Sequence, residues 1–223
     1  MKIKDLKTRL LTSLLLIFIL YISISHSYIL IISLIFISSI SWIEFRALIN
    51  KIFLRETVKL RFIKTTILGA SLIYLTLFSF VVFHGISQEN FKPIMLFLIS
   101  ICICSDIGGL LFGKIFKGKK LTKISPNKTI SGSVGSFVLS FFLILIFYSL
   151  LENKFNNIFE ILMLVTFVSF FCQLGDLFIS FLKRKAKVKD TGDLLPGHGG
   201  LLDRLDGILF AVPIGMVIYN FLI

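Results

Sequence analysis

The chain has 223 residues, of which 56% are hydrophobic and only 16% are charged. A soluble domain of this length cannot bury so much apolar surface, so the composition excludes a soluble globular protein and indicates an integral membrane protein. The formal net charge of +12 leaves two explanations, contact with nucleic acid or contact with a membrane surface.

Long apolar runs follow one another along the whole chain. Several of them reach or approach the roughly 20 residues that a helix needs to cross about 30 Å of hydrocarbon. They predict an all-α, polytopic membrane protein with about seven transmembrane helices. The predicted spans are residues 10–25, 28–45, 66–85, 94–113, 131–151, 159–182 and 205–223. The first run is short, so residues 10–45 form either two full spans or a tight hairpin that turns at residues 25–27.

The basic residues between the spans give the orientation. With a cytoplasmic N-terminus, the inner segments carry 22 of the 24 Lys and Arg residues, and the outer segments keep Lys92 and Lys154. The inner segments are then residues 1–9, 46–65, 114–130 and 183–204. The positive-inside rule therefore supports both the number of spans and a cytoplasmic N-terminus. Topology and anionic lipid headgroups account for the net charge, so nucleic acid is not expected as a partner.

The chain shows no internal repeat of fixed period and no low-complexity linker, which predicts a single membrane domain over residues 1–223. Residues 1–99 offer only hydrophobic helices, whereas the motifs with chemical content lie in residues 100–223. Cysteine spacing suggests neither a disulfide framework nor a zinc site.

Asp106 lies inside the fourth predicted span and Asp176 inside the sixth. Asp106 lies eight residues before Lys114, and Asp176 lies seven residues before Lys183. At 1.5 Å per residue both carboxylates lie about 10 Å below the cytoplasmic boundary. An ionised carboxylate there costs several kcal/mol unless it is paired, hydrated or bound to a cation. A salt bridge or a neutral acid explains one such residue equally well, but two at matching depth favour a shared polar site.

The stretch "KVKDTGDLLPGHGGLLDRLDG", residues 187–207, combines glycines, carboxylates and cations. Asp203 and Asp206 lie on one face where the seventh span begins, although acids in a first helical turn also favour the helix dipole in any protein. The preceding glycines let the backbone approach a ligand and turn its N–H groups outward. Carboxylates suit Mg²⁺, and nearby cations neutralise phosphate. The nearby cations are Lys183, Arg184, Lys187, Lys189 and Arg204.

A second loop, "KKLTKISPNKTISGSVGS" at residues 119–136, precedes the fifth span. A Ser or Thr there caps a helix in any protein, but a helix N-terminus flanked by lysine and glycine also binds anions. The predicted topology puts both loops on the cytoplasmic side. We therefore expect them to form two walls of one phosphate pocket.

Residues 180–206, "SFLKRKAKVKDTGDLLPGHGGLLDRLD", resemble the signature of the phosphatidate cytidylyltransferases, or CDP-diacylglycerol synthases. The signature reads S-x-hydrophobic-K-R, K-D, P-x-H-G-G and D-R-x-D, and every defined position is present. "SPNKTISG" at 125–132 and "SDIGGLLFGK" at 105–114 are similar to two further segments of that family. Ser131 stands where an acidic or amide residue is usual, and "SVGS" replaces a commoner glycine pair. The resemblance covers residues 100–223.

The resemblance implies an enzyme that transfers CMP from CTP to phosphatidate, giving CDP-diacylglycerol and pyrophosphate by Mg²⁺-assisted in-line attack on the α-phosphorus. It implies Asp176 and Asp203 as metal ligands, and it leaves open a second, monovalent cation. The other implied catalytic residues are Lys183, Arg184, Lys189, Arg204 and His198, the last with a loop-stabilising role as the alternative. The implied substrate-binding residues are Ser125, Lys128, Thr129, Gly199, Gly200 and Asp206. Asp206 has a second interpretation as a helix cap or a partner of Arg204, and Asp106 either orients the second loop or joins the metal network.

Three other functions compete with this one. A CTP-using dolichol or phytol kinase shares the lipid-facing chemistry, but the intact signature favours cytidylyl transfer. A CDP-alcohol phosphatidyltransferase would carry a D-G-x-x-A-R run, which the sequence lacks. A transporter would leave the glycine-rich loops unexplained. A short chain without targeting extensions predicts the bacterial inner membrane with a cytoplasmic active site, and the family analogy implies a homodimer.

Overall fold

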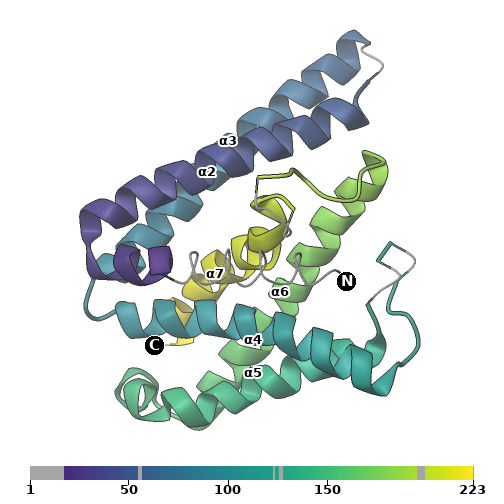
Figure 1. Ribbon diagram of the computed structural model, residues 1–223. Coiled ribbons are helices and arrows are strands. Elements are labelled where there is room, and N and C mark those ends of the chain that lie inside the picture. The colour runs from purple at the N-terminus through teal and green to yellow at the C-terminus, as the bar shows by residue number, and fades with distance from the viewer. Residues whose placement is uncertain (1–17, 55–56, 123, 126–127, 195–198, 223) are drawn as a thin grey trace. The chain divides into compact units, whose positions relative to one another are not determined.

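A computed structural model describes residues 18–54, 57–122, 124–125, 128–194 and 199–222 (Figure 1). Within these ranges the chain is helical, and six helices are long and apolar enough to cross a membrane. The prediction of an all-α polytopic membrane protein is confirmed. The first predicted span lies partly outside the described residues, although residues 18–25 are helical. His26, with an extended backbone (φ −132°, ψ 112°), separates that helix from the next one.

The helices coincide with the six predicted spans that follow residue 27. Their bounds are α2 (Ser27–Ile52), α3 (Val58–Ser87), α4 (Lys92–Phe116), α5 (Ile130–Leu151), α6 (Ile158–Lys185) and α7 (Leu202–Leu222), with a short 3₁₀ turn, η1 (Glu152–Lys154). α2 and α3 extend well into the segment 46–65 that was expected to be a loop. Hydropathy marks the hydrocarbon boundary, but backbone hydrogen bonds continue past it, and Leu48 and Ile49 on this extension are buried.

The chain divides into two compact units. Unit 1 consists of Met1–Phe83 and Leu182–Leu205, and unit 2 consists of His84–Phe181 and Asp206–Ile223. The boundaries fall inside α3, α6 and α7 rather than in linkers. The two predicted phosphate loops are consequently described in different units, and the expectation that they line one pocket stays a prediction.

In unit 1, α2 and α3 form a long antiparallel pair (Figure 1). Polar contacts join them at two levels: Ser38 Oγ lies 2.5 Å from Ser79 Oγ, and Trp42 Nε1 donates to the Leu68 carbonyl at 3.4 Å. Between these helices lies a groove of about 630 Å³, lined mostly by apolar side chains. Its lining suits hydrocarbon chains better than a polar ligand.

In unit 2, α4 provides the core. Ile94, Met95, Phe97, Leu98 and Ile101 on this helix are fully buried. α4 and α5 run side by side (Figure 1) and approach closely where glycines meet. A Cβ added at Gly108 would collide with the carbonyl oxygen of Gly135. Small residues commonly permit such close approach between membrane helices.

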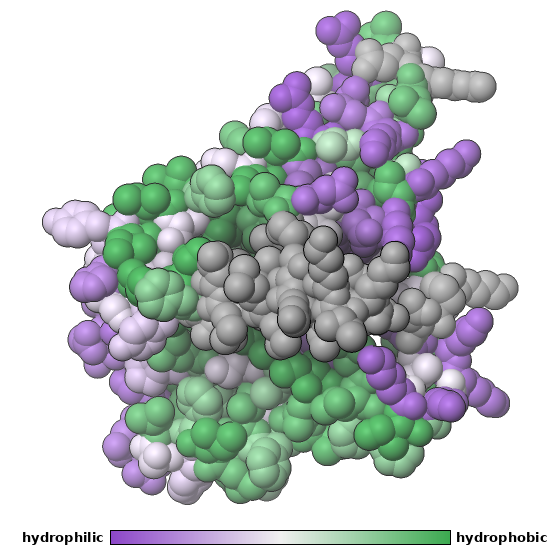
Figure 2. Space-filling model, in the orientation of Figure 1, coloured by the Kyte–Doolittle hydropathy of each residue, from purple (hydrophilic) through white to green (hydrophobic). Residues whose placement is uncertain are grey.

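The outer surfaces of the helices are strongly apolar. Large side chains such as Ile32 on α2 and Leu145 on α5 are 67% and 73% exposed. Figure 2 shows hydrophobic side chains over the middle of the α2–α3 pair and over α4 and α5, with hydrophilic ones at the end of the α2–α3 hairpin. Such surfaces suit lipid rather than water, as expected for membrane-spanning helices.

Candidate functional site

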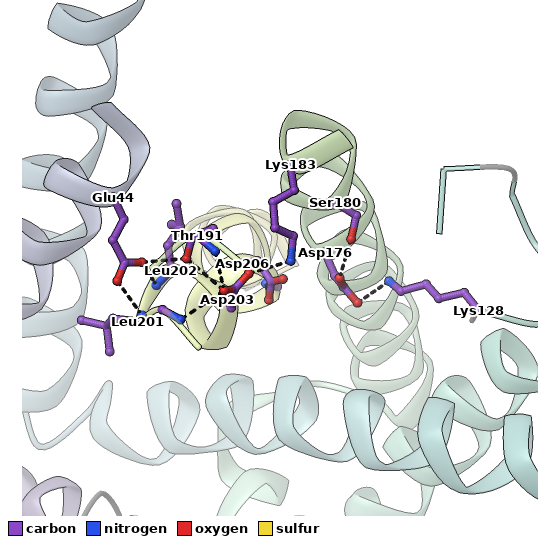
Figure 3. Close-up of polar contacts among 12 residues, drawn as sticks. Glu44, Lys128, Asp176, Ser180, Lys183, Thr191, Leu201, Leu202, Asp203 and Asp206 are labelled. Atoms are coloured by element: carbon purple, nitrogen blue, oxygen red, sulfur yellow. Dashed lines mark hydrogen bonds and ion pairs between the residues drawn. The ribbon is translucent and has the colours of Figure 1, made fainter. Parts of the chain in front are cut away.

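Asp203 lies in the first turn of α7 and is surrounded by hydrogen-bond donors (Figure 3). Its Oδ1 accepts from Lys183 Nζ, at the end of α6, at 2.6 Å. Its Oδ2 accepts from the Thr191 amide at 2.8 Å, lies 3.0 Å from the Thr191 hydroxyl, and accepts from the Gly200 amide at 3.2 Å. We call Asp203, Lys183, Thr191 and Gly200 the Asp203 cluster, all of it in unit 1.

The charges of the Asp203 cluster are largely withdrawn from solvent. The side chain of Asp203 is 7% exposed and that of Lys183 is 14% exposed. Removing two charges from water is offset only where good geometry and additional hydrogen bonds accompany the ion pair. The amide donors from the loop meet this requirement, because charge-assisted hydrogen bonds to a carboxylate are the strong ones.

A third carboxylate, Glu44 of α2, contacts the same loop. Glu44 is 6% exposed and accepts from the Thr191 hydroxyl and from the amides of Leu201 and Leu202 at 2.8 to 2.9 Å (Figure 3). The sequence reasoning missed this residue. The signal was present, because Glu44 lies inside the predicted span 28–45, where an acid is as conspicuous as Asp106 or Asp176.

The glycine-rich loop differs from its prediction in one respect. Its backbone donors were expected to turn outward towards a ligand, but the amides of Gly200, Leu201 and Leu202 donate to Asp203 and Glu44. The amide of Leu202, the first residue of α7, and the two amides just before it are thus satisfied by the protein's own carboxylates. Gly199 has a φ of +84°, which explains a glycine at that position.

The remaining predicted residues of this loop have different surroundings. Arg184, Lys189 and Arg204 are exposed residues. His198 lies outside the described residues. The structure therefore brings Asp203 together with Lys183 and Gly200, while the role of the other cations stays a prediction.

Asp176, in α6 of unit 2, forms a separate cluster. It pairs with Lys128, and Ser180 Oγ donates to its Oδ1 at 3.4 Å (Figure 3). The side chains of Lys128 and Asp176 are 25% and 29% exposed. We call Asp176, Lys128 and Ser180 the Asp176 cluster. It is more accessible than the Asp203 cluster and has fewer hydrogen-bond donors.

The loop before α5 holds Lys128 by its backbone. The Lys128 amide donates to the Ser125 carbonyl at 3.0 Å, and its own carbonyl accepts from Leu121 at 2.8 Å. Thr129 is the N-cap of α5, where its hydroxyl accepts from the Gly132 amide at 3.1 Å. The helix-capping interpretation of this loop is therefore confirmed for Thr129.

Further polar groups of unit 2 lie on α4, α5 and α6. Ser133 donates to Gln173 Oε1 at 2.5 Å, and Gln173 Nε2 is buried without a partner among the described residues. Cys172 Sγ lies 3.9 Å from an Asp106 oxygen. Cys172 itself lies on α6, one helical turn before Asp176. Asp206, the fifth residue of α7, is buried and accepts from the Gly207 amide at 2.9 Å. Its roles in substrate binding, in capping the helix or as a partner of Arg204 stay predictions.

The family resemblance implies magnesium, whose preferred ligands are oxygen atoms such as those of carboxylates. Mg²⁺ is commonly held by one or two carboxylates together with substrate phosphates. Among the described residues, no group of three or more His, Cys, Asp or Glu side chains gathers as a metal site. A Mg²⁺ ion held by one or two carboxylates and substrate phosphates does not require such a group. A lysine ammonium group stands beside Asp176 and beside Asp203, so each already holds a cation. Asp176 is the more suitable ligand, because its oxygens have fewer competing donors.

Comparison with known proteins agrees with the motifs. The model of the cytidylyltransferase family matches residues 1–222. The chain is 44% identical over 110 residues to a phosphatidate cytidylyltransferase of Bacillus subtilis (strain 168), covering 49% of this chain and 40% of that protein. It is 37% identical over 141 residues to the protein of the same name from Rickettsia typhi, covering 60% of this chain and 62% of that protein.

A third relative, a phosphatidate cytidylyltransferase of Staphylococcus epidermidis (strain ATCC 35984), is 39% identical over 136 residues, covering 60% of this chain and 52% of that protein. The chain thus spans from about 40% to 62% of the length of these curated relatives.

Proposed function

The chain belongs to the cytidylyltransferase family, and we propose that it is an enzyme that converts CTP and phosphatidate into CDP-diacylglycerol and pyrophosphate. The observation that carries this proposal is the pairing of two motif carboxylates with two motif lysines, Asp176 with Lys128 and Asp203 with Lys183. The names of the relatives support the choice of substrates.

The proposed reaction exchanges one phosphoanhydride for another. An oxygen of the phosphatidate phosphate attacks the α-phosphorus of CTP and forms a new P–O–P linkage. The bond between the α-phosphorus and the bridging oxygen breaks, and pyrophosphate leaves with that electron pair. Both reactants are anions, so catalysis depends on positioning and on fixed positive charge rather than on a covalent nucleophile.

The lysines are the residues best suited to supply that charge. Lys128 is fixed by backbone hydrogen bonds of its loop, and Lys183 projects from the last turn of α6. Arg184, Lys189 and Arg204 are exposed and add cations for the triphosphate. Asp176 and Asp203 are the residues proposed to bind Mg²⁺, and the bound ion would neutralise phosphate charge.

The membrane location suits a lipid substrate. The protein is an integral membrane protein, and its apolar surfaces keep it in the layer where phosphatidate resides. We place it in the bacterial inner membrane with the motif loops facing the cytoplasm, where CTP is available. A homodimer remains part of the proposal by analogy with the family.

The test is a product assay on the purified full-length chain with phosphatidate, CTP and Mg²⁺, read by mass spectrometry, with EDTA as a control. CDP-diacylglycerol and pyrophosphate formed only in the presence of metal support the proposal. A phosphorylated lipid alcohol formed in a parallel reaction with dolichol or phytol would instead support a lipid kinase. A folded protein without turnover on any of these lipids would contradict the proposed function.

A further inference from the structure

Glu44 is a buried carboxylate that neither the signature motifs nor the proposed reaction employs. It lies on α2, outside the motif-bearing residues 100–223, and is 6% exposed. Its three donors come from the motif stretch: Leu201 N to Oε1 at 2.9 Å, and Leu202 N and the Thr191 hydroxyl to Oε2 at 2.8 Å. A buried carboxylate with this many donors is held firmly in place.

The loop is shaped to admit this carboxylate. A Cβ added at Gly200 would collide with the Thr191 hydroxyl oxygen and lie 2.5 Å from Glu44 Oε2, and one added at Gly192 would lie 2.8 Å from Glu44 Oε1. A side chain at position 192 would displace the Glu44 carboxylate, and one at position 200 would displace both the Thr191 hydroxyl and that carboxylate. The contact between Thr191 and Glu44 therefore gives a reason for two of the glycines, independent of substrate binding.

Thr191 connects Glu44 to Asp203. The Thr191 hydroxyl lies 2.8 Å from Glu44 Oε2 and 3.0 Å from Asp203 Oδ2, but it has a single hydrogen to donate. Both carboxylates lie within hydrogen-bond distance of this one donor, so the hydroxyl bridges them. Asp203 keeps the Thr191 amide, the Gly200 amide and Lys183. The position of the Asp203 carboxylate thus depends on a residue that Glu44 fixes.

We propose that Glu44 is a positioning residue for the reaction: it holds Thr191 and the first turn of α7 so that Asp203 and Lys183 keep their geometry. This inference rests on the proposed function for its kinetic consequence. Glu44 itself touches no substrate and acts through Thr191, Leu201 and Leu202. Removal of groups that orient a reacting residue typically costs about 10- to 100-fold in activity.

Glu44→Gln is the sharpest variant because the shape of the side chain is retained. Each Glu44 oxygen faces an amide N–H, so the NH₂ group of glutamine would oppose a donor in either orientation. Glu160→Gln is the matched control. Glu160 also accepts from a backbone amide near the start of a helix, because the Asn156 amide donates to it at 2.8 Å. This contact is exposed and lies in unit 2.

The kinetic experiment measures kcat per folded molecule and KM for CTP in full-length protein. Glu44→Gln is expected to lower kcat by about 10-fold or more, with a smaller change in KM, whereas Glu160→Gln leaves both unchanged. Thr191→Ser keeps the hydroxyl and is expected to retain activity. Thr191→Val lacks the hydroxyl and is expected to lose activity. The double variant Glu44→Gln/Thr191→Val should be no slower than Glu44→Gln, because the two residues act in one network.

Hydrogen exchange supplies a readout that does not depend on turnover. The amides of residues 199–204 are expected to exchange about 10-fold faster in Glu44→Gln and at the original rate in Glu160→Gln. An unchanged kcat per folded molecule, even with a lower melting temperature, would overturn the positioning role. Equal damage from Thr191→Ser and Thr191→Val would overturn the connection through the hydroxyl. A wild-type protein without product would contradict the proposed function, and the exchange comparison would then decide the Glu44 contact alone.

Discussion

At the scale of single residues, the two motif carboxylates differ in their surroundings. Asp203 is 7% exposed at its side chain and meets donors from Lys183, Thr191 and Gly200. Asp176 is 29% exposed and pairs with Lys128, with a longer contact from Ser180. Removing one partner of an ion pair lowers the free energy of unfolding much more when the pair is buried than when it is accessible. The same substitution should therefore have different consequences for stability at the two positions.

Asp176→Asn is expected to abolish turnover while lowering the free energy of unfolding by about 1 kcal/mol or less, because its ion pair is partly solvated. Asp203→Asn is expected to abolish turnover and also to cost about 3 kcal/mol, because the buried Lys183 loses its counter-charge. Product formation and detergent-solution melting curves measure both effects. Equal melting temperatures for the two variants would contradict this distinction, and near-normal turnover in either would remove that residue from the site.

At the scale of secondary structure elements, α4 and α5 are held together by close backbone contact. Gly108 and Gly135 face each other so closely that neither position has room for a side chain. α5 carries Thr129 at its N-cap, and Lys128 directly precedes it. The packing of these two helices therefore positions the loop that presents Lys128 to Asp176.

Gly108→Ala is expected to destabilise the protein by roughly 1–3 kcal/mol, because the added methyl group meets backbone that cannot move aside. Gly69→Ala in α3 is the matched control. A Cβ at Gly69 has no neighbour within 4 Å, so this variant should be neutral or stabilise the helix by about 0.5–1 kcal/mol. Melting temperatures in detergent check both variants. A Gly108→Ala protein as stable as Gly69→Ala would contradict the close contact.

At the scale of the whole molecule, the distribution of basic residues predicts which loops face the cytoplasm. The segments 46–65, 114–130 and 183–204, which include the adjoining helix ends, carry 18 of the 24 Lys and Arg residues, whereas the other two connections and their helix ends carry only Lys92 and Lys154. This asymmetry agrees with motif loops on the cytoplasmic side. The proposed use of CTP requires the same orientation.

Single cysteines introduced at exposed positions test this orientation with a membrane-impermeant maleimide. Lys59→Cys, Lys119→Cys and Lys185→Cys are expected to react only after the inner membrane is permeabilised. Glu89→Cys and Asn157→Cys should react in intact spheroplasts. Reaction of Lys119→Cys in intact spheroplasts would reverse the predicted topology and contradict a cytoplasmic site.

The sequence by itself determined the class, the helices and the motif residues. Apolar runs long enough to cross a bilayer have few alternatives to helix, because lipid offers no partners to the backbone. Six of the predicted spans are therefore helices in the structure. The signature contains Asp203 and Lys183, and the second motif contains Lys128. Asp176 was conspicuous because an acid is rarely placed inside a membrane span without a polar partner.

Only the tertiary structure decided how these residues are used. The pairing of Lys128 with Asp176 and the contact of Glu44 with the amides of Leu201 and Leu202 join residues that lie apart in the sequence. Periodicity and hydropathy report the surroundings of a residue along its own helix, whereas a hydrogen bond between distant segments depends on how those segments pack. For this reason the acid in α2 was visible in the sequence, but its partner loop was not.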